Sequence, residues 1–165
     1  MEKSNIVLIG MPSSGKSTIG EILAKRLGMG LIDTDDVIRT RENKALGDIV
    51  KEDGLDKFLK AQESAVVGLD VDNHVISTGG SIVYSDASMR HLKQKGLVIF
   101  LKLEYEEIER RVSVQRRFAR NEGQSLCDLY RERMPLYEKY ADVTVDCSGK
   151  DIDEIVEEIC RLAAK

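Results

Sequence analysis

The sequence predicts an α/β fold in which a parallel sheet is covered by helices on both faces. Short apolar runs alternate with longer amphipathic runs along the chain, and this alternation favours parallel strands joined by helical crossovers. The 165 residues, 42% hydrophobic and 33% charged, suit one compact domain. We expect a single domain over residues 1–165 because no repeat, low-complexity tract or linker divides it.

The expected strands are short apolar runs, which are typical of strands buried inside a sheet. The first, N-I-V-L-I, opens the chain, and the others recur after each amphipathic stretch. They are expected at residues 5–9, 30–32, 74–77, 97–101 and 143–145.

The expected helices place apolar residues three and four positions apart. In the first of them Ile19, Ile22, Leu23 and Leu27 form one stripe, and Gly28 ends it. Between the sixth and seventh helices, Q-R-R-F-A-R-N-E-G-Q is rich in charge and poor in apolar residues, which predicts an exposed, mobile segment. The helices are expected at residues 16–27, 34–40, 46–51, 55–69, 85–95, 104–114, 125–140 and 152–163.

Composition limits the partners and the location. The net charge of -4 argues against a general nucleic-acid binder. The first apolar run has five residues, too few for a signal peptide or a membrane span, so we expect a cytoplasmic protein without a membrane partner. Cys127, Cys147 and Cys160 are far apart and odd in number, which favours reduced thiols over a zinc site or a disulfide framework.

A phosphate-binding motif follows the first strand and opens the first helix. Residues 10–17, G-M-P-S-S-G-K-S, match G-x-x-x-x-G-K-[ST]. The glycines let the backbone wrap around an anion, so that N–H groups and the helix N-terminus face the phosphates. Lys16 reaches the outer phosphates and the Ser17 hydroxyl can ligate magnesium, so the motif predicts a nucleoside triphosphate with Mg²⁺. The expected nucleotide-binding residues of this segment are Met11, Pro12, Ser13, Ser14, Gly15, Lys16, Ser17 and Thr18.

An acidic motif, D-T-D-D, follows the second strand. Ligands of open α/β sheets bind at the carboxyl ends of the strands, which places Asp33 and Asp35 near the phosphate-binding loop. A carboxylate there can hold magnesium through water, or orient an attacking hydroxyl and accept its proton. The alternative is a helix N-cap, for which Asp and Thr are favoured without any chemistry. Beside a phosphate-binding loop we favour the chemical interpretation.

Together these segments resemble the shikimate kinase family, a small member of the nucleoside-monophosphate-kinase-like P-loop group. The resemblance rests on G-M-P-S-S-G-K-S-T-I-G, L-I-D-T-D, V-I-S-T-G-G and R-M-P-L-Y-E-K-Y-A-D, which occur in family order over most of the chain. It implies a three-layer fold with a five-stranded parallel sheet of order 2-3-1-4-5 and a mobile lid, here about residues 113–124. It also implies transfer of the γ-phosphoryl group of ATP to a hydroxyl of a small molecule, shikimate in the first place, and a monomer or weak homodimer.

The resemblance assigns roles to single residues. Lys16, Asp35 and Arg117 would be catalytic, with Arg117 or its neighbour Arg116 meeting the transferring phosphate from the lid. Ser17 and Asp33 would hold the metal, and Arg111 and Arg117 would contact the nucleotide. The acceptor would lie in a region that includes residues 34–62, where Asp35 would bind its hydroxyls. The backbone of Gly79 and Gly80 would face it and Arg133 would bind its carboxylate; for Arg133 the alternative is an ordinary surface charge.

The sequence departs from the family pattern in the acceptor region. The family carries an arginine where this chain has Leu59, and a glutamate where it has Gln62. Leu59 shares a helical stripe with Leu55, Phe58 and Val66, so it can simply pack. Because the family's arginine and its glutamate are both replaced in this chain, we interpret the two changes as one coherent alteration of the acceptor pocket.

One candidate for compensation is Arg39, four residues after Asp35 on the same helical face, which we hypothesise turns toward the acceptor. A surface ion pair with Asp35 or Asp36 is the competing interpretation. A kinase for another hydroxylated acid or polyol, or a binding protein that lost catalysis, are the alternative functions. A nucleotide kinase and a GTPase are disfavoured because no base-recognition segment or N-K-x-D signature is present.

Overall fold

A five-stranded parallel sheet forms the centre of the computed structural model, which describes residues 3–112 and 123–164. The strand order is β2-β3-β1-β4-β5, as expected. Strand β1 lies in the middle, between β3 and β4, so its carboxyl end is the point where the strand order reverses and where open α/β sheets bind ligands. The strands are β1 Asn5–Ile9, β2 Gly30–Asp33, β3 His74–Ser77, β4 Gly96–Lys102 and β5 Val143–Asp146.

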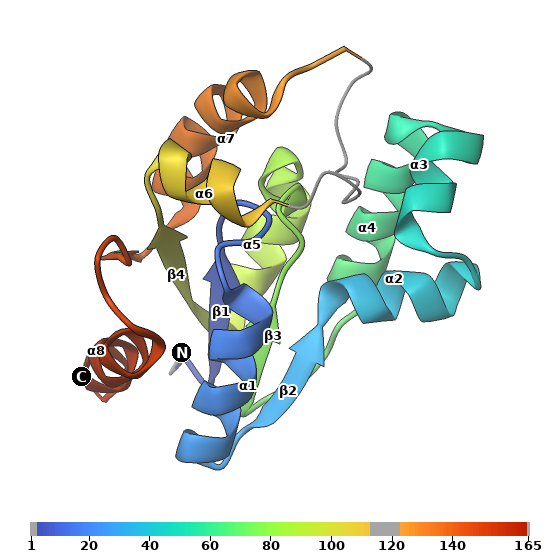
Figure 1. Cartoon of the computed structure of the whole chain (residues 1–165). Coiled ribbons are helices and arrows are strands. Elements are labelled where there is room, and N and C mark those ends of the chain that lie inside the picture. The colour runs from blue at the N-terminus through green and yellow to red at the C-terminus, as the bar shows by residue number, and fades with distance from the viewer. Residues whose placement is uncertain (1–2, 113–122, 165) are drawn as a thin grey trace.

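Helices cover both faces of this sheet (Figure 1). Within the described residues they agree with the sequence prediction to within a few residues, apart from the one-turn 3-10 helix η1, Ile82–Tyr84, which was not foreseen. The end of the helix expected over 104–114 lies outside the described residues. In the view of Figure 1, α1 lies in front of the sheet and α5 behind it, while α2, α3 and α4 form a group at one side. The helices are α1 Lys16–Leu27, α2 Thr34–Glu42, α3 Leu46–Asp53, α4 Leu55–Val67, α5 Asp86–Lys95, α6 Tyr105–Arg111, α7 Leu126–Tyr140 and α8 Ile152–Ala163.

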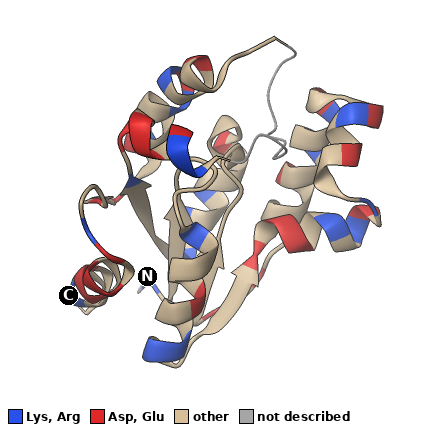
Figure 2. Ribbon diagram, in the orientation of Figure 1, with Lys and Arg blue, Asp and Glu red and all other residues tan. Residues whose placement is uncertain are grey.

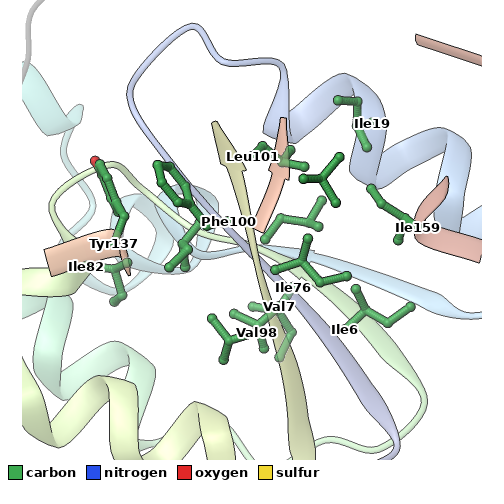
Figure 3. Packing of buried hydrophobic residues seen from close by; sticks show 14 of the residues in the cluster. Ile6, Val7, Ile19, Ile76, Ile82, Val98, Phe100, Leu101, Tyr137 and Ile159 are labelled. Atoms are coloured by element: carbon green, nitrogen blue, oxygen red, sulfur yellow. The ribbon is translucent and has the colours of Figure 1, made fainter. Parts of the chain in front are cut away.

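The main core consists of the inward residues of the strands and the apolar stripes of the helices. Figure 3 shows Ile19 of α1 and Ile159 of α8 on one side, near Leu101, and Tyr137 of α7 stacked on Phe100 on the other. Burial of such large side chains stabilises the fold by roughly 1.5–3 kcal/mol each. The site described below therefore rests on a rigid sheet edge.

A second, smaller core joins α2, α3 and α4. Ile38, Ile49, Phe58 and Ala65 are buried in it, and Leu59 packs against it. The sequence-based expectation that Leu59 is accommodated by packing is therefore confirmed. In the described residues no helix is long and apolar enough to cross a bilayer.

Asp142 joins three segments next to β5 and gives a stability prediction. Its carboxylate accepts the Val98 N–H at 2.8 Å and lies 3.1 Å from Lys93 Nζ and 3.4 Å from Lys3 Nζ. Desolvation raises the pKa of this carboxyl, but the Val98 N–H and the two lysines outweigh it, so the pKa lies below its usual value. A lowered folded-state pKa stabilises the fold above the unfolded pKa, and this contribution is lost as pH falls through the folded value.

Asp142→Asn is expected to lower the free energy of unfolding by about 1–2 kcal/mol at neutral pH. Urea unfolding of both proteins between pH 7 and pH 3 should show the difference shrink below about pH 4, because the unfolded state then binds a proton that the folded state takes up only at lower pH. Asp36→Asn is the control, since Asp36 pairs with Arg39 at the surface with 67% of its side chain exposed. A constant difference across the pH range would contradict the assignment.

Candidate active site

The loop between β1 and α1 has the backbone geometry of an anion-binding cup. Ser13 and Gly15 adopt positive φ values of 64° and 97°, and Gly10 has a φ of 153°. A side chain on Gly10 would begin 2.9 Å from the carbonyl oxygen of Leu101, so only glycine lets the loop lie this close to β4. The loop then enters α1 directly, and its N-cap, Gly15, has no side chain to cap the first N–H groups of the helix.

Lys16 is folded onto this loop. Its side chain is 8% exposed, and Nζ donates to the carbonyl oxygens of Gly10 and Met11 at 2.7 Å each. These contacts fix the ammonium group beside the cup. Of the other expected loop residues, Met11 and Pro12 are buried, Ser14 lies 3.4 Å from Lys16 Nζ, and Thr18 is exposed in the first turn of α1.

Ser17 and Asp33 come together although 16 positions separate them. The Ser17 hydroxyl donates to Asp33 Oδ2 at 3.3 Å, and Asp33 Oδ1 accepts the Asp35 N–H at 2.9 Å. Asp33 is therefore the N-cap of α2, which was one of the two interpretations of the sequence, and it also contacts the phosphate-binding loop. A hydroxyl and a carboxylate oxygen at one point fit Mg²⁺, which prefers oxygen ligands and takes few of them from protein.

Asp35, in the first turn of α2, lies against the end of β3. A side chain on Gly79 would begin 2.6 Å from Asp35 Oδ1, so the glycine leaves room for this carboxylate. The Gly79 N–H itself donates to Thr34 Oγ1 at 3.1 Å, which ties β3 to α2. Gly79 thus makes room for Asp35 by its lack of a side chain, and its N–H is taken by Thr34.

Acidic residues mark the start of α2 and basic residues its end (Figure 2).

Arg133 of α7 is buried, with 1% of its surface exposed, so it is not an ordinary surface charge. Its guanidinium carbon lies 5.3 Å from the centre of the Tyr84 ring, and Nε donates to the Tyr84 hydroxyl at 3.3 Å. A side chain on Gly80 would begin 2.8 Å from Arg133 Nη1 and 2.9 Å from Pro12 Cδ. The guanidinium therefore reaches the edge of the phosphate-binding loop through the space that Gly80 leaves.

Tyr137, one turn after Arg133, contacts Gly80. Its hydroxyl donates to the Gly80 carbonyl oxygen at 2.6 Å. Burial raises the pKa of Tyr137 to about 12, so the hydroxyl keeps its proton at physiological pH and acts as a fixed donor. Neither Tyr84 nor Tyr137 was singled out from the sequence for the site: the near-helical spacing of Tyr137 with Tyr130 and Tyr140 predicts packing, and no motif points to Tyr84.

Gln62 of α4 completes the acceptor side. It is 1% exposed, and its Oε1 accepts the Ser81 hydroxyl at 3.1 Å. Gln62 and Ser81 line an open pocket of about 110 Å³ together with Leu59 and Tyr84. The sequence pointed to Gln62 only as a departure from a family pattern and gave no contact for it.

The remaining predicted site residues lie further out. Arg39 pairs with Asp36 at 3.0 Å and half of its side chain is exposed, so the geometry favours the surface pair over acceptor binding. Arg111 donates to Glu107 at 2.9 Å and approaches the Ser13 carbonyl oxygen at 3.5 Å, which places it beside the phosphate-binding loop. Arg116, Arg117 and most of the expected lid, residues 113–124, lie outside the described residues.

Comparisons with known proteins agree with this geometry. A family model described as shikimate kinase matches residues 12–164. A shikimate kinase of Clostridium botulinum (strain Eklund 17B / Type B) is 40% identical over 162 residues, which cover 97% of this chain and 97% of that protein. Threonine synthase-like 1 of Macaca fascicularis is 33% identical over 160 residues, but these cover only 22% of its length.

A solved structure, shikimate kinase from Acinetobacter baumannii in complex with shikimate, superimposes with a TM-score of 0.89 at 26% identity. The match covers 98% of this chain and 93% of that one. A gluconokinase from Sinorhizobium meliloti at 21% identity and a TM-score of 0.59 shares the fold alone. The family-model match and the identity to curated relatives leave one conclusion: the chain belongs to the shikimate kinase family.

Proposed function

We propose that this protein transfers the γ-phosphoryl group of ATP to a hydroxyl of shikimate, giving shikimate 3-phosphate. One observation carries the proposal: the phosphate-binding loop, Asp35 and the buried Arg133 converge at the carboxyl edge of one sheet, although they come from distant parts of the chain. The family membership and the shikimate-bound relative from Acinetobacter baumannii support the same acceptor.

On the nucleotide side, the exposed N–H groups of the loop and the start of α1 bind the phosphates. Lys16 moves from the Gly10 and Met11 carbonyl oxygens to the more strongly accepting phosphate oxygens. The Ser17 hydroxyl and, through water, the Asp33 carboxylate would hold Mg²⁺, which when bound would offset the charge of the phosphates. Arg111 lies close enough to contact the nucleotide, and Arg117 keeps its sequence-based role as a lid arginine.

On the acceptor side, Asp35 accepts a hydrogen bond from the attacking hydroxyl and takes its proton as the bond to phosphorus forms. Arg133 binds the acceptor carboxylate with a planar guanidinium, which suits a carboxylate better than a lysine ammonium does. Its stacking on Tyr84 and its contact with Gly80 fix the guanidinium relative to the phosphate-binding loop. Catalysis of this kind needs positioning and charge neutralisation more than covalent chemistry.

Arg133→Met is expected to raise the KM for shikimate roughly 10- to 100-fold, because one charge-assisted contact is lost, and to leave the KM for ATP within about twofold. Coupled ADP-release kinetics measure both. Arg131→Met, an exposed residue of the same helix, is the control. Thermal unfolding of the variant checks that the fold persists. An unchanged KM for shikimate would show that Arg133 does not bind the acceptor.

A second acceptor class is favoured by one observation: Leu59 stands where the family has an arginine, and it packs into the second core. A site that keeps only Arg133 as a buried arginine on the acceptor side could serve another small hydroxylated acid. The same ADP-release assay with shikimate and a panel of hydroxy acids and polyols decides between the two, because the physiological class should give the highest kcat/KM.

A further inference from the structure

The side-chain amide of Gln62 has an unused hydrogen-bond donor. Its Nε2 is fully buried and has no partner among the residues that the structure describes. Leaving such a group without a partner destabilises the folded protein. At the edge of a ligand site this cost is offset if the ligand itself supplies the acceptor.

The orientation of the amide follows from its neighbours. Ser81 Oγ donates to Gln62 Oε1 at 3.1 Å, which turns the NH₂ group toward Gly79 and Asp35. The opposite orientation would place the amide oxygen toward the Asp35 carboxylate, where two acceptors would repel each other. Ser81 therefore acts as a positioning residue for the amide.

The donor lies next to the expected acceptor-binding carboxylate. The point where a Gly79 side chain would begin is 2.6 Å from Asp35 Oδ1 and 3.2 Å from Gln62 Nε2, so both atoms lie against the face of Gly79 where any other residue would carry a side chain. The Asp35 carboxylate accepts hydrogen bonds and the Gln62 amide donates them. An acceptor hydroxyl brought to this face can donate to Asp35 and accept from Gln62 at once.

We propose that Gln62 is a specificity residue that binds, together with Asp35, the acceptor hydroxyl adjacent to the one that is phosphorylated. The reacting hydroxyl itself is excluded from this contact, since a donor on its lone pairs would weaken it as a nucleophile. The inference rests on the proposed function and names the substrate group that this subsite reads. For shikimate phosphorylated at the 3-position, the group is the 4-hydroxyl.

A purely structural role for Gln62 makes a different prediction. The tie between α4 and the end of β3 uses Oε1 and the Ser81 hydroxyl alone, and it leaves Nε2 idle. Loss of that tie would lower stability and affect every acceptor alike. Loss of a contact to one hydroxyl affects only acceptors that carry this hydroxyl, so the two roles separate when protein and substrate are changed together.

The experiment compares wild type, Gln62→Met and Ser81→Ala with shikimate, 4-deoxyshikimate and 5-deoxyshikimate. Gln62→Met keeps the approximate length and volume but removes both the Nε2 donor and the Oε1 acceptor of the Ser81 hydroxyl, and Gln94→Met, at an exposed site on α5, is the matched control. We expect Gln62→Met to raise the KM for shikimate and for 5-deoxyshikimate roughly 3- to 10-fold, with the KM for ATP unchanged. With 4-deoxyshikimate, wild type and Gln62→Met should have the same KM.

Three results would overturn the inference: an unchanged KM for shikimate in Gln62→Met, an increase that persists with 4-deoxyshikimate, or an equal increase for all three acceptors. If Gln62→Met does not fold, Ser81→Ala decides, because a freed amide should reduce the wild-type preference for shikimate over 4-deoxyshikimate. If that preference does not fall, the inference is also overturned.

Wild-type turnover of shikimate, measured first, tests the proposed function separately. If another acid is the acceptor, its deoxy analogue at the neighbouring carbon is used, and a best acceptor without adjacent hydroxyls overturns the inference.

Discussion

Replacing Lys16 with methionine is expected to lower kcat at least about 100-fold, the loss that follows removal of one fixed donor to transition-state charge. The side chain is held at the mouth of the phosphate-binding loop by two carbonyl oxygens, so its ammonium group is already positioned for the outer phosphates. Methionine keeps the chain length and removes the charge. Single-turnover measurements with saturating ATP and acceptor give the rate of the chemical step directly.

The control for this substitution is Lys25→Met in the same helix, since Lys25 has 79% of its side chain exposed and pairs only with Glu21 among the described residues. It should keep the wild-type rate. If Lys16→Met retained more than a tenth of the wild-type kcat, the phosphate-binding role of this loop would be untenable.

Asp35→Asn is expected to reduce kcat by roughly 10²- to 10⁴-fold, the usual range for loss of a general base. Asparagine preserves the shape beside Gly79 and can still contact an acceptor hydroxyl, so the KM for the acceptor should change much less than kcat. Circular dichroism should show an unaltered fold, because the Asp35 backbone N–H, which Asp33 caps, remains in place.

Asp36→Asn supplies the comparison for Asp35, one position further along α2. Asp36 is exposed and pairs with Arg39, so its change should leave kcat within about twofold. Equal effects of the two substitutions would indicate a general loss of helix stability and would remove Asp35 from the mechanism.

Local patterns were enough to predict the frame of the site. The loop after β1 and the acidic residues after β2 could be located from sequence because both follow buried strands, and parallel strands bring their carboxyl ends to one edge. Buried strands and amphipathic helices are visible as local hydrophobic patterns, which is why element positions agree closely with the structure.

The details of the acceptor side needed the three-dimensional structure. Burial of Arg133 depends on Gly80 leaving room for it and on Tyr84 stacking against it, and Tyr84 lies 49 positions away in the sequence. Gly79 was expected to offer its N–H to a ligand, but Thr34 takes that N–H, a contact between distant segments that no local pattern encodes. The unused amide donor of Gln62 likewise becomes visible only when its neighbours are counted.

The structure also explains how the changes at Leu59 and Gln62 can coexist with an intact nucleotide site. Leu59 contributes to the core between α2, α3 and α4, and Gln62 carries no charge that would need a partner. The phosphate-binding loop follows β1 and opens α1, which pack in the main core, whereas Leu59 packs against the second core. Changes in acceptor preference can therefore arise without loss of ATP binding.

The most direct test of this account follows the label from ATP carrying ³²P in the γ-phosphate. Incubated with the protein, Mg²⁺ and shikimate, the label should appear in a phosphorylated shikimate in step with ADP formation, and Lys16→Met should abolish its appearance. If the label is released only as inorganic phosphate, at a rate that does not change when shikimate is added, the account is contradicted.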